Sequence, residues 1–180
     1  MAALRTLATA SLFFALVIAG ACRGKYHRAA VENEEPASGP RLAASLKMGD
    51  PTASAQLVKG LYGVESGSWR WTSGHFSILL RSPLAAAQRG GTLTFSFTIP
   101  DVVYQKLGKI TMTVSSGGKK LNSDSFGTAG VHTLTADVPA DLLIKDSVTF
   151  DFDLDKALPP SGAESRELGV IATAISLESK

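Results

Sequence analysis

An alternation of apolar and polar residues, repeated along the second half of the chain, constrains the fold more than any other feature. In the stretch TLTFSFTI, residues 92–99, the apolar positions are Leu93, Phe95, Phe97 and Ile99. The stretches KITMTVSS (109–116) and SVTFDFDLD (147–155) repeat this pattern. Because side chains along a strand point alternately to opposite faces, the pattern predicts strands with one buried face.

Glycine- and proline-containing turn signals separate these runs. They include SSGGKK at 115–120, FGTAG at 126–130 and LPPSG at 158–162. Short strands at such spacing favour an all-β fold, a single antiparallel β-sandwich or jelly-roll-like domain over residues 56–180.

The densest aromatic and polar stretch, YGVESGSWRWTSGHF at residues 62–76, holds both tryptophans of the chain. Alternation places Trp69 and Trp71 on one strand face and Arg70 on the other. Aromatic faces stack on the apolar faces of sugar rings, so we expect a carbohydrate site on Trp69 and Trp71. Arg70 and Glu65 are the expected partners of the sugar hydroxyls. Alternatively, one or both indole rings fill the core of the sandwich.

Three aspartates lie on one face of the strand predicted at 147–155. Asp151, Asp153 and Asp155 alternate with apolar residues. Clustered carboxylates are ligands for Ca²⁺, but the glycine and the acid of an EF-hand loop are replaced by Lys156 and Gly162. We therefore favour a solvated strand face and predict no metal site.

Sequence motifs for catalysis are missing from the chain. It has no nucleophile elbow, Walker loop, dinucleotide-binding glycine motif or zinc-protease motif, so we assign no catalytic residue and no cofactor. A small hydrolase that uses His75 and surface carboxylates stays open as an alternative, because the separation of two carboxylates is a spatial property. The formal net charge of +2, without a basic cluster, argues against a nucleic-acid partner.

Two short stretches resemble small β-sandwich modules found beside glycosyltransferases and methyltransferases in bacterial surface-polysaccharide systems. In such modules an RWT-like stretch opens the domain, and a D-x-R-x-LG-like stretch precedes the last strand. The corresponding residues here are Arg70, Trp71 and Thr72, then Arg166, Leu168 and Gly169, with Glu164 in the place of the aspartate. The resemblance spans most of residues 57–178 and implies a β-sandwich, without implying a catalytic residue.

The start of the chain has the layout of a secretory signal peptide. Arg5 is followed by an uncharged apolar run and by small residues before Cys22, the only cysteine. Small residues before a cysteine resemble the bacterial lipobox, although Ala19 stands where leucine is more usual. The resemblance implies removal of residues 1–21 and lipidation of Cys22, and Arg23 implies no inner-membrane retention. An ordinary signal peptide and an uncleaved anchor helix are the alternatives.

Residues 22–55 lack sustained periodicity and are rich in Ala, Pro, Gly, Ser and charge, which predicts a flexible tether. A short helix near residues 41–47 is compatible with their composition.

From the signal at the start of the chain, we expect an exported, lipid-anchored cell-envelope protein, in the outer membrane if the source is Gram-negative. Its β-sandwich is expected to be a non-catalytic binding or structural module, with polysaccharide as the favoured ligand. The alternative is an interaction subunit of an envelope protein assembly, which an apolar patch at Tyr62 and Phe76 would favour.

Overall fold

The computed structural model describes residues 41–180, in which nine strands pair antiparallel. The strands are β1 (Ser45–Lys47), β2 (Leu57–Glu65), β3 (Trp69–Arg81), β4 (Gly91–Ile99), β5 (Ile110–Ser116), β6 (Lys119–Phe126), β7 (Gly130–Val138), β8 (Ser147–Leu154) and β9 (Ile171–Ser179). The short helices are η1 (Pro51–Gln56), α1 (Ala86–Arg89), α2 (Asp101–Leu107) and η2 (Ala140–Leu143).

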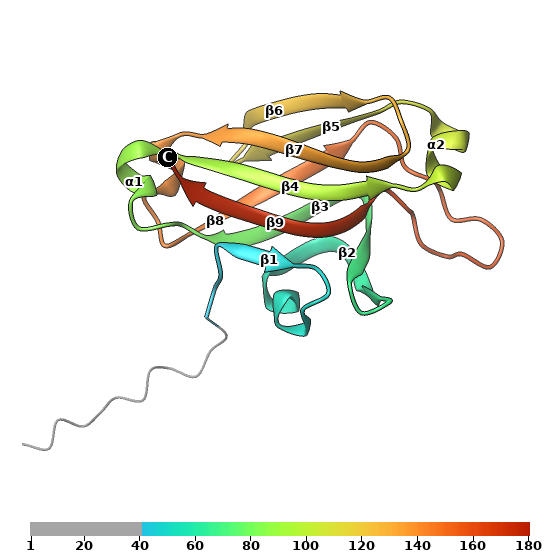
Figure 1. The fold of residues 1–180 in the computed structure, drawn as a ribbon, viewed down its shortest axis with the longest axis horizontal. Helices are drawn as coiled ribbons and strands as arrows, with labels where there is room; N and C mark the ends of the chain where they lie inside the picture. Colours follow the sequence, from blue (N-terminus) through green and yellow to red (C-terminus); the bar gives the residue numbers. More distant parts are fainter. Residues whose placement is uncertain (1–40) are drawn as a thin grey trace, which may run out of the picture. The chain divides into compact units, whose positions relative to one another are not determined.

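A single sheet with the strand order β6-β5-β8-β3-β9-β4-β7 folds over on itself into two layers (Figure 1). The layer of β7, β4, β9 and β1 faces the viewer, and β6, β5, β8 and β3 lie behind it. Strand β3 belongs to both layers, because Trp71 lies opposite Ile171 of β9 while residues 75–81 pair with β8. The expected all-β, sandwich-like fold is therefore confirmed.

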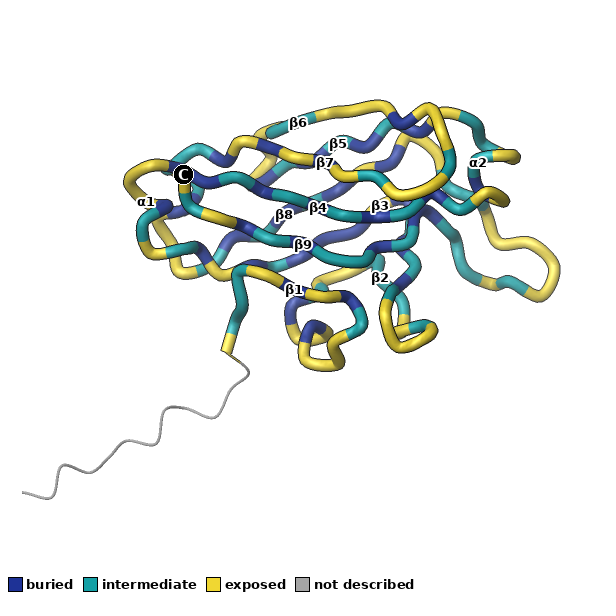
Figure 2. Tube along the Cα trace, viewed as in Figure 1, coloured by how far each residue is buried: buried dark blue, intermediate teal, exposed yellow. Residues whose placement is uncertain are grey.

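The core lies between the two layers and consists of the residues that the alternation predicts. Buried and less buried positions alternate along β4, β5 and β8 (Figure 2). Phe76 and Phe152 stack with ring centroids 4.7 Å apart, and Phe95 lies 4.9 Å from Phe152. Burying a phenylalanine side chain contributes about 1.5–3 kcal/mol, so this aromatic cluster is a large part of the driving force that holds the layers together.

The folded unit begins earlier than the expected boundary at residue 56. Strand β1 pairs with β9, with Leu46 opposite Ile175. The Gln56 side chain accepts a hydrogen bond from the Ala43 N–H (2.7 Å) and donates to the Ala43 carbonyl (2.9 Å) and the Leu79 carbonyl (2.6 Å). Part of the expected tether is thus a strand segment, and residues 45–47 are extended rather than helical.

The lipidation signal and most of the expected tether, residues 1–40, lie outside the described residues. Within residues 41–180, no helix is long and apolar enough to cross a membrane.

Candidate functional site

The two tryptophans project from the outer face of β3. They lie at the start of this strand, directly after the turn that links β2 to β3. Both side chains are half-buried, and their rings pack edge to face with centroids 6.2 Å apart. Trp71 also packs against the edge of the hydrophobic core. The indole rings are therefore partly open to solvent and do not fill the centre of the sandwich.

Arg70 points to the opposite face, as the alternation predicts, and is only 6% exposed. Its guanidinium donates hydrogen bonds to the Met48 carbonyl (2.9 Å), the Tyr62 carbonyl (3.0 Å) and the Ser54 hydroxyl (2.9 Å). Burial lowers the pKa of Arg70. These contacts give Arg70 a structural role, holding β2 and η1 to β3, and they leave it turned away from the two indole rings.

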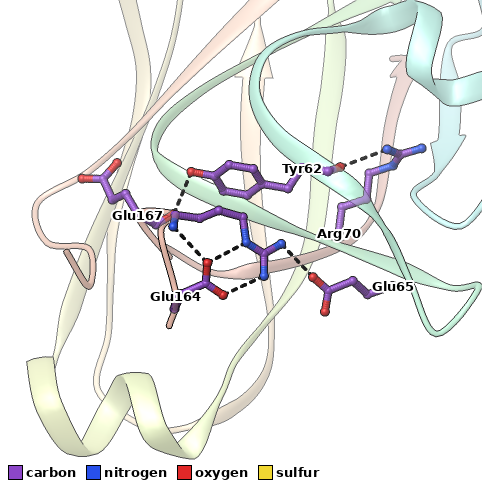
Figure 3. A network of polar contacts seen from close by, with 6 residues as sticks. Tyr62, Glu65, Arg70, Glu164 and Glu167 are labelled. Atoms are coloured by element: carbon purple, nitrogen blue, oxygen red, sulfur yellow. Dashed lines mark hydrogen bonds and ion pairs between the residues drawn. The ribbon is translucent and has the colours of Figure 1, made fainter. Parts of the chain in front are cut away.

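Glu65 lies directly opposite Trp69 in the β2–β3 hairpin, so both side chains project from the same face. Its Oε1 accepts a hydrogen bond from Nη1 of Arg166 at 2.8 Å (Figure 3). The Arg166 guanidinium also lies 5.2 Å from the centre of the Tyr62 ring. The expected polar partner Glu65 is thus fixed beside the aromatic pair by a residue 101 positions further along the chain.

Glu164 holds the other side of the Arg166 guanidinium. Its carboxylate accepts from Nε (2.9 Å) and Nη2 (2.8 Å), and also from the Arg166 backbone N–H (2.9 Å). These hydrogen bonds lower the pKa of Glu164 to about 2 and raise the pKa of Arg166. Arg166 is therefore a fixed cation between two carboxylates, Glu65 and Glu164.

The two stretches that carry the sequence resemblance meet in space. The Gly169 N–H donates to the Thr72 carbonyl (2.7 Å), and the Val170 N–H donates to the Thr72 hydroxyl (3.1 Å). A Cβ on Gly169 would lie 2.7 Å from Leu154, Ser73 and Thr72 atoms, so this contact requires glycine. The residues of both stretches thus join the loop before β9 to the start of β3.

Asp151 and Asp153 of β8 and Asp155, which directly follows this strand, project outward, and each meets a different neighbour. Asp153 pairs with the exposed His75 ring, Asp151 accepts from the Ser77 hydroxyl, and Asp155 accepts from the Thr111 N–H. No local sequence pattern points to Asp153 as the partner of His75, because it lies 78 residues away and its position is set by the β3–β8 register. Among the described residues, no three His, Cys, Asp or Glu side chains come together as a metal site.

The hydrolase alternative gains one residue from this geometry, because Asp153 pairs with the His75 ring. In the hydrogen-bond network of residues 41–180, no serine or threonine hydroxyl bonds to the His75 ring, as a hydrolase nucleophile would. Phe76 is fully buried, and the Tyr62 hydroxyl donates to the Glu167 carbonyl at 2.9 Å. Tyr62 and Phe76 therefore do not form the apolar patch that would favour a protein partner.

Comparisons with known proteins find structural likeness only. No family model matches the chain, and no curated protein matches its sequence. A family GH115 4-O-methyl-α-glucuronidase specific for decorated arabinogalactans is 11% identical, with a TM-score of 0.46 over 78% of this chain and 18% of its own.

Two solved structures of separate modules align over nearly their whole length. One is a carbohydrate-binding module of Clostridium stercorarium in complex with cellobiose, at 9% identity and a TM-score of 0.40 over 77% of this chain and 95% of its own. The other is the mannan-recognising module TmCBM27, at 12% identity and a TM-score of 0.42 over 78% and 98%.

Proposed function

We propose that the protein is a non-catalytic carbohydrate-binding module of the cell envelope, with Trp69 and Trp71 as its sugar-contacting residues. The observation that carries this proposal is the position of the two rings, half-buried on the outer face of the sheet. Large aromatic rings held rigid and partly open are suited to stacking against the apolar face of a sugar.

Glu65 supplies the polar part of the proposed site. It stands opposite Trp69, and its Oε1 is engaged by Arg166. The second carboxylate oxygen accepts no hydrogen bond from the described residues, so it is available to a sugar hydroxyl. A charge-assisted hydrogen bond of this kind is stronger than a neutral one and would fix the orientation of the sugar.

The proposal also places the protein on a membrane. The signal at the start of the chain supports export, with lipidation at Cys22 and an outer-membrane position in a Gram-negative source. The carbohydrate site of residues 41–180 would then face the polysaccharides of the envelope.

The test uses the two tryptophans as reporters, since the chain has no others. Trp69→Phe and Trp71→Phe each leave one indole, and iodide quenching is measured while neutral and acidic envelope oligosaccharides are titrated. We expect sugar to protect both rings from iodide and Trp71→Ala to abolish binding. Leu84→Ala, which truncates a 99% exposed apolar side chain elsewhere, is the matched control and should bind normally. Quenching that no oligosaccharide changes would refute the proposal.

A further inference from the structure

The two outer faces of the sandwich are both rich in serine and threonine, but their hydroxyl groups are used differently. On the face of β5, β6 and β8 the hydroxyls pair with each other, Thr111 with Ser125 at 2.9 Å and Thr113 with Ser123 at 2.8 Å. Ser77 of β3 donates to Asp151 on the same face. Five hydroxyls of this face are thus satisfied within the sheet, while those of Ser115, Ser147 and Thr149 make none of the hydrogen bonds of the described residues.

The opposite face, formed by β7, β4, β9 and β1, carries hydroxyls in cross-strand rows. Thr94 of β4 lies opposite Thr135 of β7 and Ser176 of β9, and Ser176 lies opposite Ser45 of β1. In the adjacent row, Ser96 lies opposite Thr133. In the hydrogen bonds of the described part of the chain, none is made by the hydroxyl groups of these residues: Ser45, Thr94, Ser96, Thr133, Thr135 and Ser176.

Free hydroxyls in fixed rows suit a ligand that itself carries many hydroxyl groups. Each hydroxyl offers one donor and two acceptor positions, and the strands hold successive groups of a row about 4.8 Å apart. The row through Thr94 carries no charge. The acidic side chains of this face, Asp137 and Glu178, flank Thr92 near one end, where Asp137 pairs with Lys180.

The aromatic pair lies on the same face as these rows. Trp71 is opposite Ile171 of β9, which is opposite Thr98 of β4. A hollow of about 510 Å³ lies beside the start of β3, where Ser68 of the β2–β3 turn faces Thr173 and Ala174 of β9. Lys47 and Asp50, of opposite charge, also line it. The β2–β3 turn bounds the hollow, because the Gly67 carbonyl approaches Gly49 too closely for any side chain there.

The spacing of these features sets the minimum size of the ligand. Thr98 and Thr94 are four residues apart on β4, which corresponds to about 13 Å along the strand. One sugar ring does not span that distance. The two carboxylates on Arg166, Glu65 and Glu164, leave an excess negative charge beside the rings, which disfavours an anionic ligand.

We propose that the β7–β4–β9–β1 face extends the tryptophan site and binds a neutral polysaccharide chain along several sugar units. This inference rests on the proposed carbohydrate-binding function and adds the length, the charge and the path of the ligand. Trp69 and Trp71 contact one part of the chain, and the hydroxyl rows through Thr94 and Ser96 contact the units that follow.

The experiment measures affinity against ligand length with the full chain. The probes are cello-, manno- and isomaltooligosaccharides of one to six units, with oligogalacturonides of the same lengths as the charged comparison. The variant Thr94→Val/Thr135→Val removes two hydroxyls from one row while keeping β-branched side chains. Thr113→Val on the opposite face is the matched control, and thermal unfolding confirms that each variant is folded.

We expect affinity for one neutral series to rise up to at least four units and to exceed that for oligogalacturonides. Thr94→Val/Thr135→Val should weaken the longest ligand about tenfold or more and leave the disaccharide unchanged, because each hydrogen bond contributes roughly 0.5–1.5 kcal/mol. Thr113→Val should match the unmodified chain. Binding that is independent of length and of Thr94 and Thr135 would overturn this inference and leave the tryptophan site standing. The absence of any binding or fluorescence change would overturn both.

Discussion

At the scale of single residues, Arg70 is a buried cation whose guanidinium needs hydrogen-bond acceptors inside the domain. It is buried without a carboxylate partner among the described residues, and three neutral acceptors from β2, η1 and the preceding loop surround its guanidinium. Its stability contribution comes from satisfying those acceptors, because an unsatisfied buried polar group costs about 1–3 kcal/mol. A side chain of similar length without hydrogen-bond donors would leave all three acceptors unpaired.

We expect Arg70→Met to lower the free energy of unfolding by roughly 2–4 kcal/mol. Urea unfolding followed by tryptophan fluorescence measures the change. Arg89→Met, at an exposed position in α1, is the matched control and should stay within about 0.5 kcal/mol of the unmodified chain. Equal stability of the two variants would show that the Arg70 hydrogen bonds contribute nothing to the fold.

The lowered pKa of Glu164 makes the stability of the fold depend on pH. Its pKa falls from 4.5 to about 2 in the folded state because it accepts three hydrogen bonds from Arg166. A lowered folded-state pKa means that the carboxylate stabilises the fold above the unfolded pKa and that this stabilisation is lost as the pH falls from about 4.5 towards 2.

We therefore expect Glu164→Gln to reduce the thermal unfolding temperature at pH 7 and to differ progressively less from the unmodified chain below pH 4.5. Differential scanning fluorimetry across pH 2–7 is the measurement. Asp141→Asn removes an exposed carboxylate in η2 and serves as the control. A Glu164→Gln difference that stays constant down to pH 2 would contradict the assignment.

At the scale of elements, the Gln56 side chain makes hydrogen bonds to backbone groups that a neighbouring strand would otherwise make. Its side-chain amide bonds both backbone groups of Ala43 and also reaches Leu79 of β3. The segment before β1 is in this way fixed between the two layers, with the Arg81 N–H donating to the Ala43 carbonyl at 3.0 Å. The side chain closes the gap that opens where β3 leaves β9 for β8.

We expect Gln56→Ala to raise amide hydrogen exchange across residues 43–48 by at least tenfold while exchange in β4 and β8 stays slow. The reason is that three partly buried backbone groups each lose a hydrogen bond worth about 1 kcal/mol, and only the Ala43 carbonyl keeps another donor, the Arg81 N–H. Mass spectrometry of exchanged peptides makes the comparison, with the exposed Gln88→Ala as control. Uniform exchange across all strands would instead indicate that the variant destabilises the whole domain.

The elements that the sequence predicts well are those whose signal is local. Strands β4, β5 and β8 follow from alternation alone. Alternation also places Trp69 and Trp71 on the face opposite Arg70, but it does not say which of the two faces points outward. Strand β1 does not, because its residues favour a helix and become extended only through pairing with β9, some 130 positions away. The register between β3 and β8 equally decides that His75 meets Asp153.

Only those features of the candidate site that depend on local alternation can be predicted from the sequence. Alternation separates Arg70 from the two tryptophans, but it cannot show that Met48, Tyr62 and Ser54 surround the guanidinium. Arg166 was singled out through a sequence resemblance, while its bond to Glu65 depends on the loop before β9 folding back to β2. Contacts between distant segments carry no local sequence signal.

At the scale of the whole molecule, the proposed glycan site and the proposed membrane anchor occupy separate parts of the chain. Every residue of the site lies within 41–180, and the anchor depends on Cys22 alone. Each acyl CH₂ that enters a membrane contributes about 0.8 kcal/mol, and two or more chains are needed for stable attachment. Membrane attachment and sugar binding are therefore expected to respond to different substitutions.

We predict that Cys22→Ser, expressed in a Gram-negative bacterium, loses palmitate labelling and moves from the detergent phase to the aqueous phase of a Triton X-114 partition. The same variant should keep its oligosaccharide affinity, because the substitution lies far in sequence from Trp69 and Trp71. Ala21→Ser preserves a small residue before the cysteine and should be labelled normally. Labelling that survives Cys22→Ser would place the lipid elsewhere, and an unmodified chain that takes up no label would show that this start of the chain is an ordinary signal peptide or an uncleaved helix.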